Sequence, residues 1–342
     1  MVFYVSSTFA ESPCWFWKPV SEEYTGFIGS ASPTSVMPNG SLLSSRKNAL
    51  KRFIDFYQID ITPLEDKLLL KDELYIEGWF VRFSAPYITK DTLFSYALVS
   101  QSKPSINTKT AEIWLTKGCT KQTCEFRRCS PQWLCNSAGD QIFGVSQMTS
   151  IPSKQLSFMH ENAALFDSFL RESNVNSTSH FVESISESQN WRYRDQTSSV
   201  EASANSSLNP LLNTDICKTE NYIVGLFERP ETTLLNGKPF SEWKINPNLK
   251  NRVGVTGTFD GLTADGLLST AVKLAIKNGL IELAKIKNVS IDHEYQLTFL
   301  NGWYSLTKST ESTLATVSAV LMDLKVVEED EKLVMFVWLL DI

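Results

Sequence analysis

The stretch Gln296-Leu-Thr-Phe-Leu-Asn-Gly-Trp-Tyr-Ser-Leu-Thr307 decides how the C-terminal part of the chain folds. Asn-Gly between alternating apolar residues is the strongest short-range signal for a β-hairpin, because a type I′ turn needs positive φ at both central positions. A two-residue loop at Asn301-Gly302 would place Leu297 opposite Leu306 and put both on one apolar face. We therefore predict a hairpin in this register.

Further turn signals lie on both sides of this hairpin. Asp260-Gly261 follows an apolar run that starts at Val253, and the acidic residues 328–331 separate two apolar runs, the second ending at Leu340. Asn278-Gly279 has two interpretations: the turn of another hairpin, or the C-terminal stop of a helix over 264–287, a segment rich in Ala, Leu and Lys. Both interpretations stay open from the sequence. We predict an antiparallel sandwich or barrel for the C-terminal part.

The last strand has no polar face. Residues 333–340 are eight consecutive apolar residues, whereas an antiparallel strand with one solvated face alternates. Both faces must therefore be covered, either by the chain's own fold or by another chain. Burying each large side chain contributes about 1.5–3 kcal/mol, so coverage by another chain would favour an oligomer. We accordingly expect Met335, Phe336 and Trp338 at an interface.

The N-terminal part combines helices with strands. Apolar residues at helical spacing over 44–60 and 154–172 predict two amphipathic helices. β-Branched and aromatic residues predict strands at 67–70, 74–83, 93–99 and 111–116. Residues 171–210 include eleven serines among forty residues, as is typical of a linker or a long surface loop, and no convincing internal repeat is visible. We expect a mainly β, α+β protein with an irregular N-terminal arm (1–43), an α+β domain (44–170), a Ser-rich linker or long surface loop (171–210) and an antiparallel β domain (211–342).

Charge and hydropathy exclude some classes of function. The net charge of -6 argues against a chain that coats nucleic acid, because phosphate neutralisation needs clustered Lys and Arg. No apolar run reaches the roughly 18–20 residues that a transmembrane helix needs. The first residues lack the basic region and the sustained apolar core of a signal peptide. We therefore expect an intracellular protein without a membrane span.

Three adjacent aromatic residues lie in the Pro-rich N-terminal segment. Trp15, Phe16 and Trp17 cannot all point into one small core if the segment is irregular. The segment either packs across its own domain or docks on a neighbouring subunit, where aromatic anchors dominate binding energies. These three residues are therefore candidates for a subunit interface.

Four of the six cysteines fall within seventeen residues. Such a cluster could bind one zinc ion as thiolates, form disulfides in an oxidising environment, or remain as free thiols. The spacing lacks the Cys-x-x-Cys knuckle of common zinc sites, and four cysteines permit three disulfide pairings that sequence cannot rank. All three outcomes stay open for this cluster, in which zinc is the one possible cofactor: Cys119, Cys124, Cys129 and Cys135.

Catalytic signatures are missing from the sequence. The chain has three histidines, no Gly-x-Ser-x-Gly elbow and no phosphate-binding loop of the Gly-Lys-Ser/Thr type. The features that stand out are architectural: an aromatic segment, a Ser-rich excursion, hairpins and a doubly apolar last strand. We therefore expect a non-enzymatic structural or assembly protein that self-associates, with no catalytic residue assigned.

Residues 253–342, with the turns Asp260-Gly261, Asn278-Gly279 and Asn301-Gly302, are similar to the β-rich domains of coat and spike proteins of non-enveloped viruses. The size and acidic character of the chain resemble the outer-shell spike proteins of plant-infecting reoviruses, which face an insect vector. This resemblance implies a capsid or spike component in the virion or the host cytoplasm. Its partners would be copies of itself and other shell or scaffold proteins, with host or vector attachment as a role. It carries no functional residue over to this chain.

Two other functions are compatible with the sequence. A carbohydrate-binding β-sandwich, or a glycoside-active protein, could use some of the nine Trp residues as a sugar-stacking platform. An intracellular scaffold could be built around a zinc site made by the four clustered cysteines.

Overall fold

The computed structural model describes most of the chain in two compact units. Unit 1 comprises residues 1–134, 141–164 and 209–232, and unit 2 comprises residues 135–140, 165–208 and 233–342. The described residues are 12–60, 65–103, 108–134, 141–186, 189–203, 211–229, 237–261, 268–298, 304–329 and 332–342.

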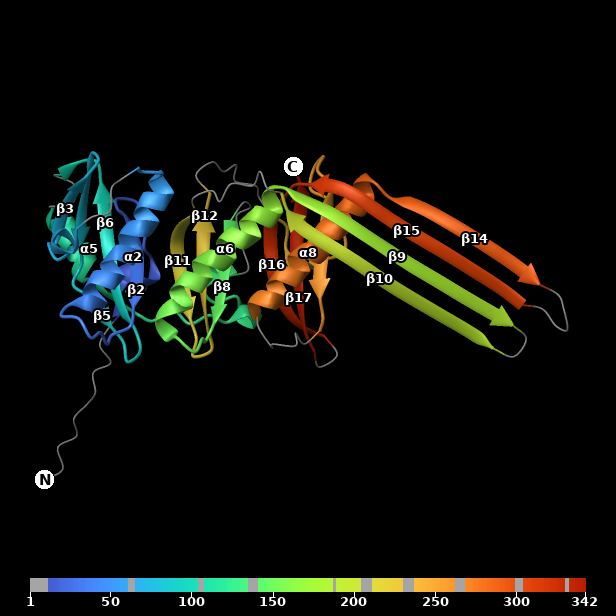
Figure 1. Ribbon diagram of the computed structural model, residues 1–342, viewed down its shortest axis with the longest axis horizontal. Coiled ribbons are helices and arrows are strands. Elements are labelled where there is room, and N and C mark those ends of the chain that lie inside the picture. The colour runs from blue at the N-terminus through green and yellow to red at the C-terminus, as the bar shows by residue number, and fades with distance from the viewer. Residues whose placement is uncertain are drawn as a thin grey trace, which may run out of the picture. The chain divides into compact units, whose positions relative to one another are not determined.

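Unit 1 begins with a five-stranded antiparallel sheet covered by one long helix. The helix α2 (Gly40–Tyr57) buries Ala49, Leu50 and Phe53 against the sheet, as its apolar spacing predicts. Residues 74–83 form two strands rather than one, because Glu77 and Gly78 both have positive φ, as a tight hairpin turn requires. The sheet (Figure 1) has the order β2-β6-β4-β3, with β5 paired to β6: β2 (Thr25–Ala31), β3 (Glu73–Ile76), β4 (Trp79–Phe83), β5 (Tyr87–Ile88) and β6 (Leu93–Ser100).

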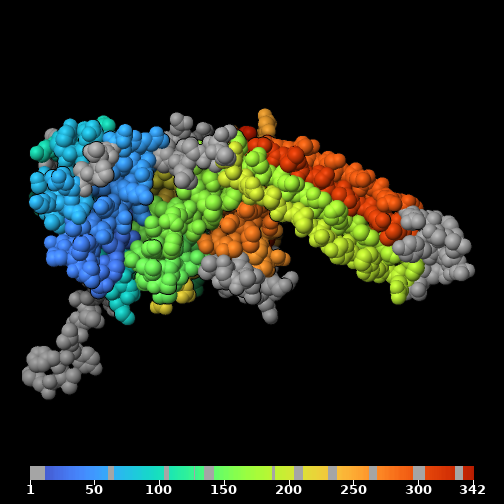
Figure 2. Space-filling model, in the orientation of Figure 1, coloured from blue at the N-terminus to red at the C-terminus, as the bar shows by residue number. Residues whose placement is uncertain are grey.

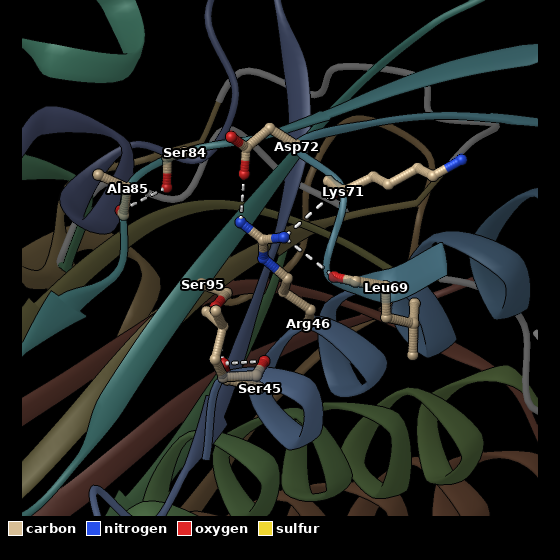
Figure 3. Close-up of polar contacts among 9 residues, drawn as sticks. Ser45, Arg46, Leu69, Lys71, Asp72, Ser84, Ala85 and Ser95 are labelled. Atoms are coloured by element: carbon tan, nitrogen blue, oxygen red, sulfur yellow. Dashed lines mark hydrogen bonds and ion pairs between the residues drawn. The ribbon is translucent and has the colours of Figure 1, made fainter. Parts of the chain in front are cut away.

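A buried arginine ties α2 to the segment that leads into β3. Arg46 Nη1 donates hydrogen bonds to the carbonyl oxygens of Leu69 and Lys71, at 2.9 and 3.0 Å, and Nη2 lies 2.7 Å from Asp72 Oδ1 (Figure 3). The guanidinium also lies over the Phe83 ring. A buried charge is stable only when it is paired and hydrogen-bonded. Of residues 67–70, predicted as a strand, the first three instead belong to the short helix α3 (Asp66–Leu69), and Leu70 is its C-cap. Arg46 binds the last carbonyl of this helix.

A second antiparallel sheet of unit 1 packs against the helix α6 (Gln155–Arg171), close to the bounds predicted for it. Residues 111–116, predicted as a strand, belong to the helix α5 (Lys109–Thr116), because the Thr108 side chain caps its N-terminus by accepting from Ala111 N. The second sheet has the order β11-β12-β8: β8 (Gln141–Gln147), β11 (Leu212–Lys218) and β12 (Tyr222–Glu228). Short 3-10 turns complete this part: η1 (Phe126–Arg128), η2 (Gln132–Leu134) and η3 (Pro152–Lys154).

The described part of the N-terminal segment, from Ser12 onward, is not the irregular arm predicted for residues 1–43. Its aromatic residues form the short helix α1 (Cys14–Trp17), flanked by β1 (Ser12–Pro13), which pairs with β7 (Gly118–Cys119). Trp15 stacks on Tyr96, and Phe16 contacts Phe94 edge-on. The segment therefore packs across its own unit, which was one of the two interpretations of the sequence.

Unit 2 has an antiparallel three-stranded sheet with the helix α8 on one face. Asn278-Gly279 lies inside this helix, so of the two interpretations the helix is correct, although it continues past the expected stop. β13 pairs with β17, while the residues that would follow a turn at Asp260-Gly261, 262–267, lie outside the described residues. The hairpin at residues 328–331 is confirmed by the pairing of β16 with β17. The elements are α7 (Phe240–Trp243), β13 (Gly254–Phe259), α8 (Leu268–Lys287), β16 (Ala319–Glu329) and β17 (Lys332–Asp341).

The doubly apolar last strand is covered by the chain itself. β17 is the central strand of the order β13-β17-β16. On one face Phe336 and Trp338 pack with Trp243, and Trp338 Nε1 donates to the carbonyl of Pro247. On the other face Leu339 approaches Gly279 of α8. The requirement for two covered faces is thus met without a second chain.

Asp323 is a buried carboxylate next to this core. Its side chain accepts hydrogen bonds from Trp243 Nε1 at 3.0 Å and from the Leu324 amide at 2.8 Å. Burial raises the pKa of Asp323 to about 6, and the two hydrogen bonds offset only part of that effect. Asp323 follows a register irregularity in β16, where the strand is locally out of step with β17.

We expect Asp323 to make the free energy of unfolding of unit 2 decrease as the pH rises. The folded-state pKa of about 6 exceeds the unfolded value of 3.8, so the folded state binds the proton more tightly and loses stability between about pH 4 and pH 6. The loss amounts to about 3 kcal/mol above pH 6. Asp323→Asn should remove this dependence and be more stable than the wild type at pH 7 but not at pH 4, by urea denaturation. If the free energies of unfolding of the wild type and Asp323→Asn change with pH in the same way, the raised pKa of Asp323 is contradicted.

One packing motif recurs three times, although the sequence shows no repeat. In each case a glycine on a strand lets the backbone of a helix approach so closely that a Cβ would overlap a helix carbonyl oxygen. In each of the three sheets the strand that carries this glycine comes first in the chain, and it pairs with the strand of that sheet that comes last. The three glycine–carbonyl contacts are Gly29 with Ser45, Gly144 with Met159 and Gly257 with Ala275.

Residues 173–202 form a long β-hairpin in unit 2 rather than a linker between domains. Its strands are β9 (Ser173–Ser186) and β10 (Asn190–Ala202). β9 also pairs with β15 (Tyr304–Val317), which pairs with β14 (Ser290–Thr298). The predicted hairpin around residues 296–307 is therefore confirmed, while its loop, 299–303, lies outside the described residues. Its register is shifted by one residue from the prediction, since Leu306 pairs with Gln296 and not with Leu297.

The fold is mainly β and of the α+β type, as predicted, with antiparallel strand pairs throughout the described sheets. The C-terminal part differs from the predicted sandwich or barrel. Its two sheets have open strand orders, and α8 contacts strands of both. An α-helix between two sheets thus replaces the direct sheet-on-sheet packing that the hairpin signals suggested.

Candidate functional site

The four-stranded sheet of unit 2, with the order β10-β9-β15-β14, is the candidate functional site, and we call it the arm. Figure 1 shows its four strands side by side, running on past the end of α8. In Figure 2 the arm is a narrow band, with the orange atoms of α8 against one end only. We call the end next to α8 the base and the other end the tip.

The base of the arm is anchored to α8. Val175 and Val200 are buried on the face that meets the helix, and Lys277 of α8 donates a hydrogen bond to the Val200 carbonyl at 2.8 Å. Lys277 Nζ also lies 4.8 Å from the centre of the Phe169 ring, and burial lowers its pKa. The base is therefore fixed by both apolar contacts and a buried polar contact.

Beyond the base, the arm is solvated on both faces. Every residue of β10 from Asn190 to Ser199 is exposed, as are the described side chains of β14 from Ile291 to Tyr295. Ile291 and Tyr295 leave 61% and 59% of their surface exposed. A sheet normally needs one apolar face in contact with other elements to be stable. The distal arm lacks such a cover within the described chain.

The backbone of β10 turns half of its polar groups away from the sheet. Ser186 N donates to Gln189 O, and Ser203 N donates to Glu172 O, at the two ends of the β9–β10 ladder. The register between these bonds is unbroken, so odd-numbered residues of β10 bond to β9. The even-numbered residues direct their N–H and C=O groups outward: Arg192, Arg194, Gln196, Ser198 and Val200.

The outward backbone groups of β14 follow from the same alternation. The β9–β15 and β15–β14 registers are also unbroken, so the alternation carries across the sheet. The even-numbered residues of β14 bond to β15. The odd-numbered residues, Ile291, His293 and Tyr295, point their backbone groups outward. The arm therefore has two edges with open hydrogen-bonding groups.

Both edges lack Pro, Lys and register shifts, which often block further pairing, but both also carry charged side chains, which are another such feature. Natural edge strands are commonly protected by Pro, by Lys, by bulges or by short length. β10 has thirteen residues without Pro, Lys or a register shift, and the nine residues of β14 likewise contain neither Pro nor Lys. Long regular edges of this kind are templates for strand addition.

Two aromatic side chains add a recognition feature to the tip of β10. Trp191 and Tyr193 lie on the same face, with ring centroids 6.1 Å apart and planes only 5° from parallel. About half of each side chain is exposed. Parallel exposed rings can stack on a sugar ring or pack against the side chains of another chain.

Two cross-strand ion pairs lie on the arm. Arg192 Nε lies 2.5 Å from Glu183 Oε1, and Lys308 Nζ lies 3.6 Å from Glu294 Oε2. Arg194 on β10 and Asp292 on β14 have no ion pair within the part of the chain that the structure describes. Exposed ion pairs of this type contribute little to stability. The charges of the edge strands matter more for which partner an edge accepts.

A second cluster, in unit 1, has a structural role. Arg52 Nη1 lies 2.8 Å from His160 Nε2 and donates to the Ile28 carbonyl at 2.7 Å. Burial lowers the pKa of Arg52 to about 9 and, with the Arg52 charge, lowers the pKa of His160 well below its usual value. A neutral imidazole that accepts from Arg52 joins α2 to α6. Arg52 is therefore part of the contact between these two helices.

The predicted zinc set is inconsistent with the disulfides. Cys119 is bonded to Cys14 and Cys124 to Cys217, so two of the four expected ligands are not thiolates. Cys129 is also disulfide-bonded, and Cys135 lies outside the described residues. Over the described ranges, three or more His, Cys, Asp or Glu side chains are nowhere grouped to hold a metal ion. The disulfide outcome is correct for Cys119 and Cys124, whose partners Cys14 and Cys217 lie outside the cluster.

The predicted interface residues are covered by their own units. Trp15, Phe16 and Trp17 are at most 3% exposed, because unit 1 packs around them. In unit 2, β17 is the central strand of its sheet, and its other three predicted interface residues are buried there: Met335, Phe336 and Trp338. These six side chains are core residues, and the expectation that they face another chain is wrong.

Sequence reasoning missed the arm because its strands carry Ser and Thr where a one-sided strand carries apolar residues. The signal that could have found it is alternation in the Ser-rich stretch, where Val175, Ser177 and Ser179 are buried and the residues between them are not. The hairpin partner was recognised from Asn301-Gly302.

No family model, no curated protein and no solved structure matches this chain. Among the described helices, none is long and apolar enough to cross a membrane.

Proposed function

We propose that the protein is a non-enzymatic assembly protein that joins copies of itself through the edges of the arm. The observation that carries this proposal is the outer strand β10, in which ten consecutive residues are exposed and the outward backbone groups are not interrupted by Pro, Lys or a bulge. Strand addition to such an edge gives main-chain hydrogen bonds without requiring a groove.

Assembly would also supply the apolar contacts and the edge partners that the distal arm lacks. The distal sheet is solvated on both faces, so few apolar contacts stabilise it within one chain. Pairing with another chain would satisfy its edge groups and cover part of Trp191, Tyr193 and Tyr295. Burial of each large side chain contributes about 1.5–3 kcal/mol. A repeating contact of this size could hold a multi-subunit structure together.

The disulfides suggest where such an assembly would reside. Two buried disulfides close long loops of unit 1, and structural disulfides persist in oxidising environments. This supports an assembly whose subunits mature or work outside the reducing cytosol. An outer shell or spike of a virus particle, with Trp191 and Tyr193 presented for host or vector attachment, is the setting that we propose on the basis of the sequence resemblance.

Blocking both edges should convert the assembly into monomers. We expect wild-type protein at micromolar concentration to have a light-scattering mass that is a multiple of the chain mass. Gln196→Pro with His293→Pro removes one outward N–H from each edge and leaves the internal ladders intact, because neither amide bonds within the sheet. This double variant should be monomeric.

The matched control is Gln196→Ala with His293→Ala, which changes the same side chains but keeps both amides. It should retain the wild-type mass. A monomeric wild type, or a proline variant with the wild-type mass and an unchanged circular dichroism spectrum, would contradict the proposal.

A further inference from the structure

We infer that copies of this chain join head to tail, with the β10 edge of one arm paired to the β14 edge of the next. This inference rests on the proposed function and specifies its geometry. A contact between two different edges is heterologous, so it generates a closed ring or an open filament and not a two-fold dimer. The partner that fits each edge is thus a second copy of the same arm.

The directions of the two edge strands carry the inference. β10 runs from the tip to the base, because Asn190 pairs near the β9–β10 turn and Ala202 pairs with Ser173. β14 runs from the base to the tip, since Ser290 pairs with Ser312 and Thr298 with Tyr304. When two arms lie side by side with both tips pointing the same way, β10 of one is antiparallel to β14 of the next. This continues the antiparallel order of the arm itself.

The hydrogen-bonding pattern is compatible with the same arrangement. The outward backbone groups belong to Arg192, Arg194 and Gln196 on one edge and to Ile291, His293 and Tyr295 on the other. Cross-strand pairing places both sets on the same face of the sheet, the face that meets α8 at the base. Hydrogen-bonded residues in an antiparallel pair share a face. Joining these edges therefore extends each face of one arm into the matching face of the next.

Charge disfavours the pairing of two β14 edges. β14 carries Asp292 and Glu294 on the face opposite α8. Arg192 and Arg194 of β10 lie on the other face, the one that meets α8 at the base. Pairing β14 with a second β14 would bring four carboxylates together, which costs free energy when like charges are adjacent. Pairing β10 with a second β10 would leave both β14 edges open. The β10–β14 contact instead uses both edges of every arm.

Two single-edge variants test the direction of assembly. Gln196→Pro blocks β10 and leaves β14 open, and His293→Pro does the reverse. Each variant alone has no complementary edge and should be monomeric by light scattering. An equimolar mixture should form a one-to-one heterodimer and stop there, because its outer edges are both blocked. Gln196→Ala and His293→Ala should each keep the wild-type mass.

Other outcomes overturn the inference in distinguishable ways. Dimers of His293→Pro alone would show β10–β10 pairing, and dimers of Gln196→Pro alone would show β14–β14 pairing. Either result leaves the proposed function standing and removes the head-to-tail geometry. A mixture that stays monomeric while the wild type is oligomeric also removes it. A wild type that is itself monomeric removes both proposals.

Discussion

Replacing Gly257 with alanine is expected to lower the free energy of unfolding of unit 2 by about 3 kcal/mol. A Cβ at this position would overlap the carbonyl oxygen of Ala275 and lie 2.6 Å from the amide nitrogen of Gly279. Both atoms belong to the backbone of α8, so no side-chain rotation can relieve the overlap. The helix would have to move away from β13, and α8 also supports the base of the arm. Denaturant unfolding followed by far-ultraviolet circular dichroism measures the loss.

Gly237→Ala is the matched control for this substitution. Its Cβ would lie 3.6 Å from Trp338 Cζ3, which is an ordinary van der Waals contact. We expect a change within about 0.5 kcal/mol. If Gly257→Ala is as stable as this control, then α8 does not pack against β13 as closely as described.

Removing the bond between Cys124 and Cys217 is expected to destabilise unit 1 by about 2–5 kcal/mol. The bond joins residues 93 positions apart, so it restricts the unfolded chain strongly. Both cysteines are buried, at 2% and 0% exposure, and alanine at both positions avoids leaving buried hydroxyl groups without partners. The measurement is denaturant unfolding of Cys124→Ala/Cys217→Ala against the wild type, without reductant.

Peptide mapping by mass spectrometry provides the independent check on this prediction. Non-reduced wild-type protein should yield the peptides of Cys124 and Cys217 linked to each other, and those of Cys14 and Cys119 likewise. Free thiols at Cys119 and Cys124 in protein purified without reductant would contradict the assignment and return zinc binding to consideration.

Local signals in the sequence were sufficient where one physical cause dominates. The helix α6 agrees with the prediction because its apolar residues repeat at helical spacing without interruption. The pairing of β16 with β17 agrees because the acidic residues between them break two long apolar runs. The requirement that β17 be covered on both faces also follows directly from its composition. In each case the signal is contained within a few turns or residues of chain.

The rest depends on tertiary contacts that no local pattern contains. Asn278-Gly279 fits a hairpin turn as well as a helix, and what decides is that Gly279 lies where α8 packs closely against Gly257 of β13. Similarly, Cys14 and Cys217 lie far in sequence from their partners, so spacing within the cysteine cluster could not reveal them. The residues predicted at an interface are strongly apolar, but this property does not distinguish a core from a subunit contact.

The arm was hidden for a related reason. Its strands alternate small polar residues with a few apolar ones, and this composition is shared by linkers and surface loops. Only the pairing of β9 with both β10 and β15 shows that residues 173–202 are a strand hairpin with an open outer edge. The candidate site therefore became visible through register and exposure, not through residue type.

Amide hydrogen exchange tests the central claim most directly. The outward amides of Arg192, Arg194, Gln196, Ile291, His293 and Tyr295 have no partner strand within one arm, so they should exchange rapidly in dilute, monomeric protein. At concentrations where the mass increases, these six amides should become protected, while inward amides such as those of Tyr193 and Asp292 change little. If the mass increases and the six amides still exchange as rapidly as in the monomer, the arm edges are not the assembly surface.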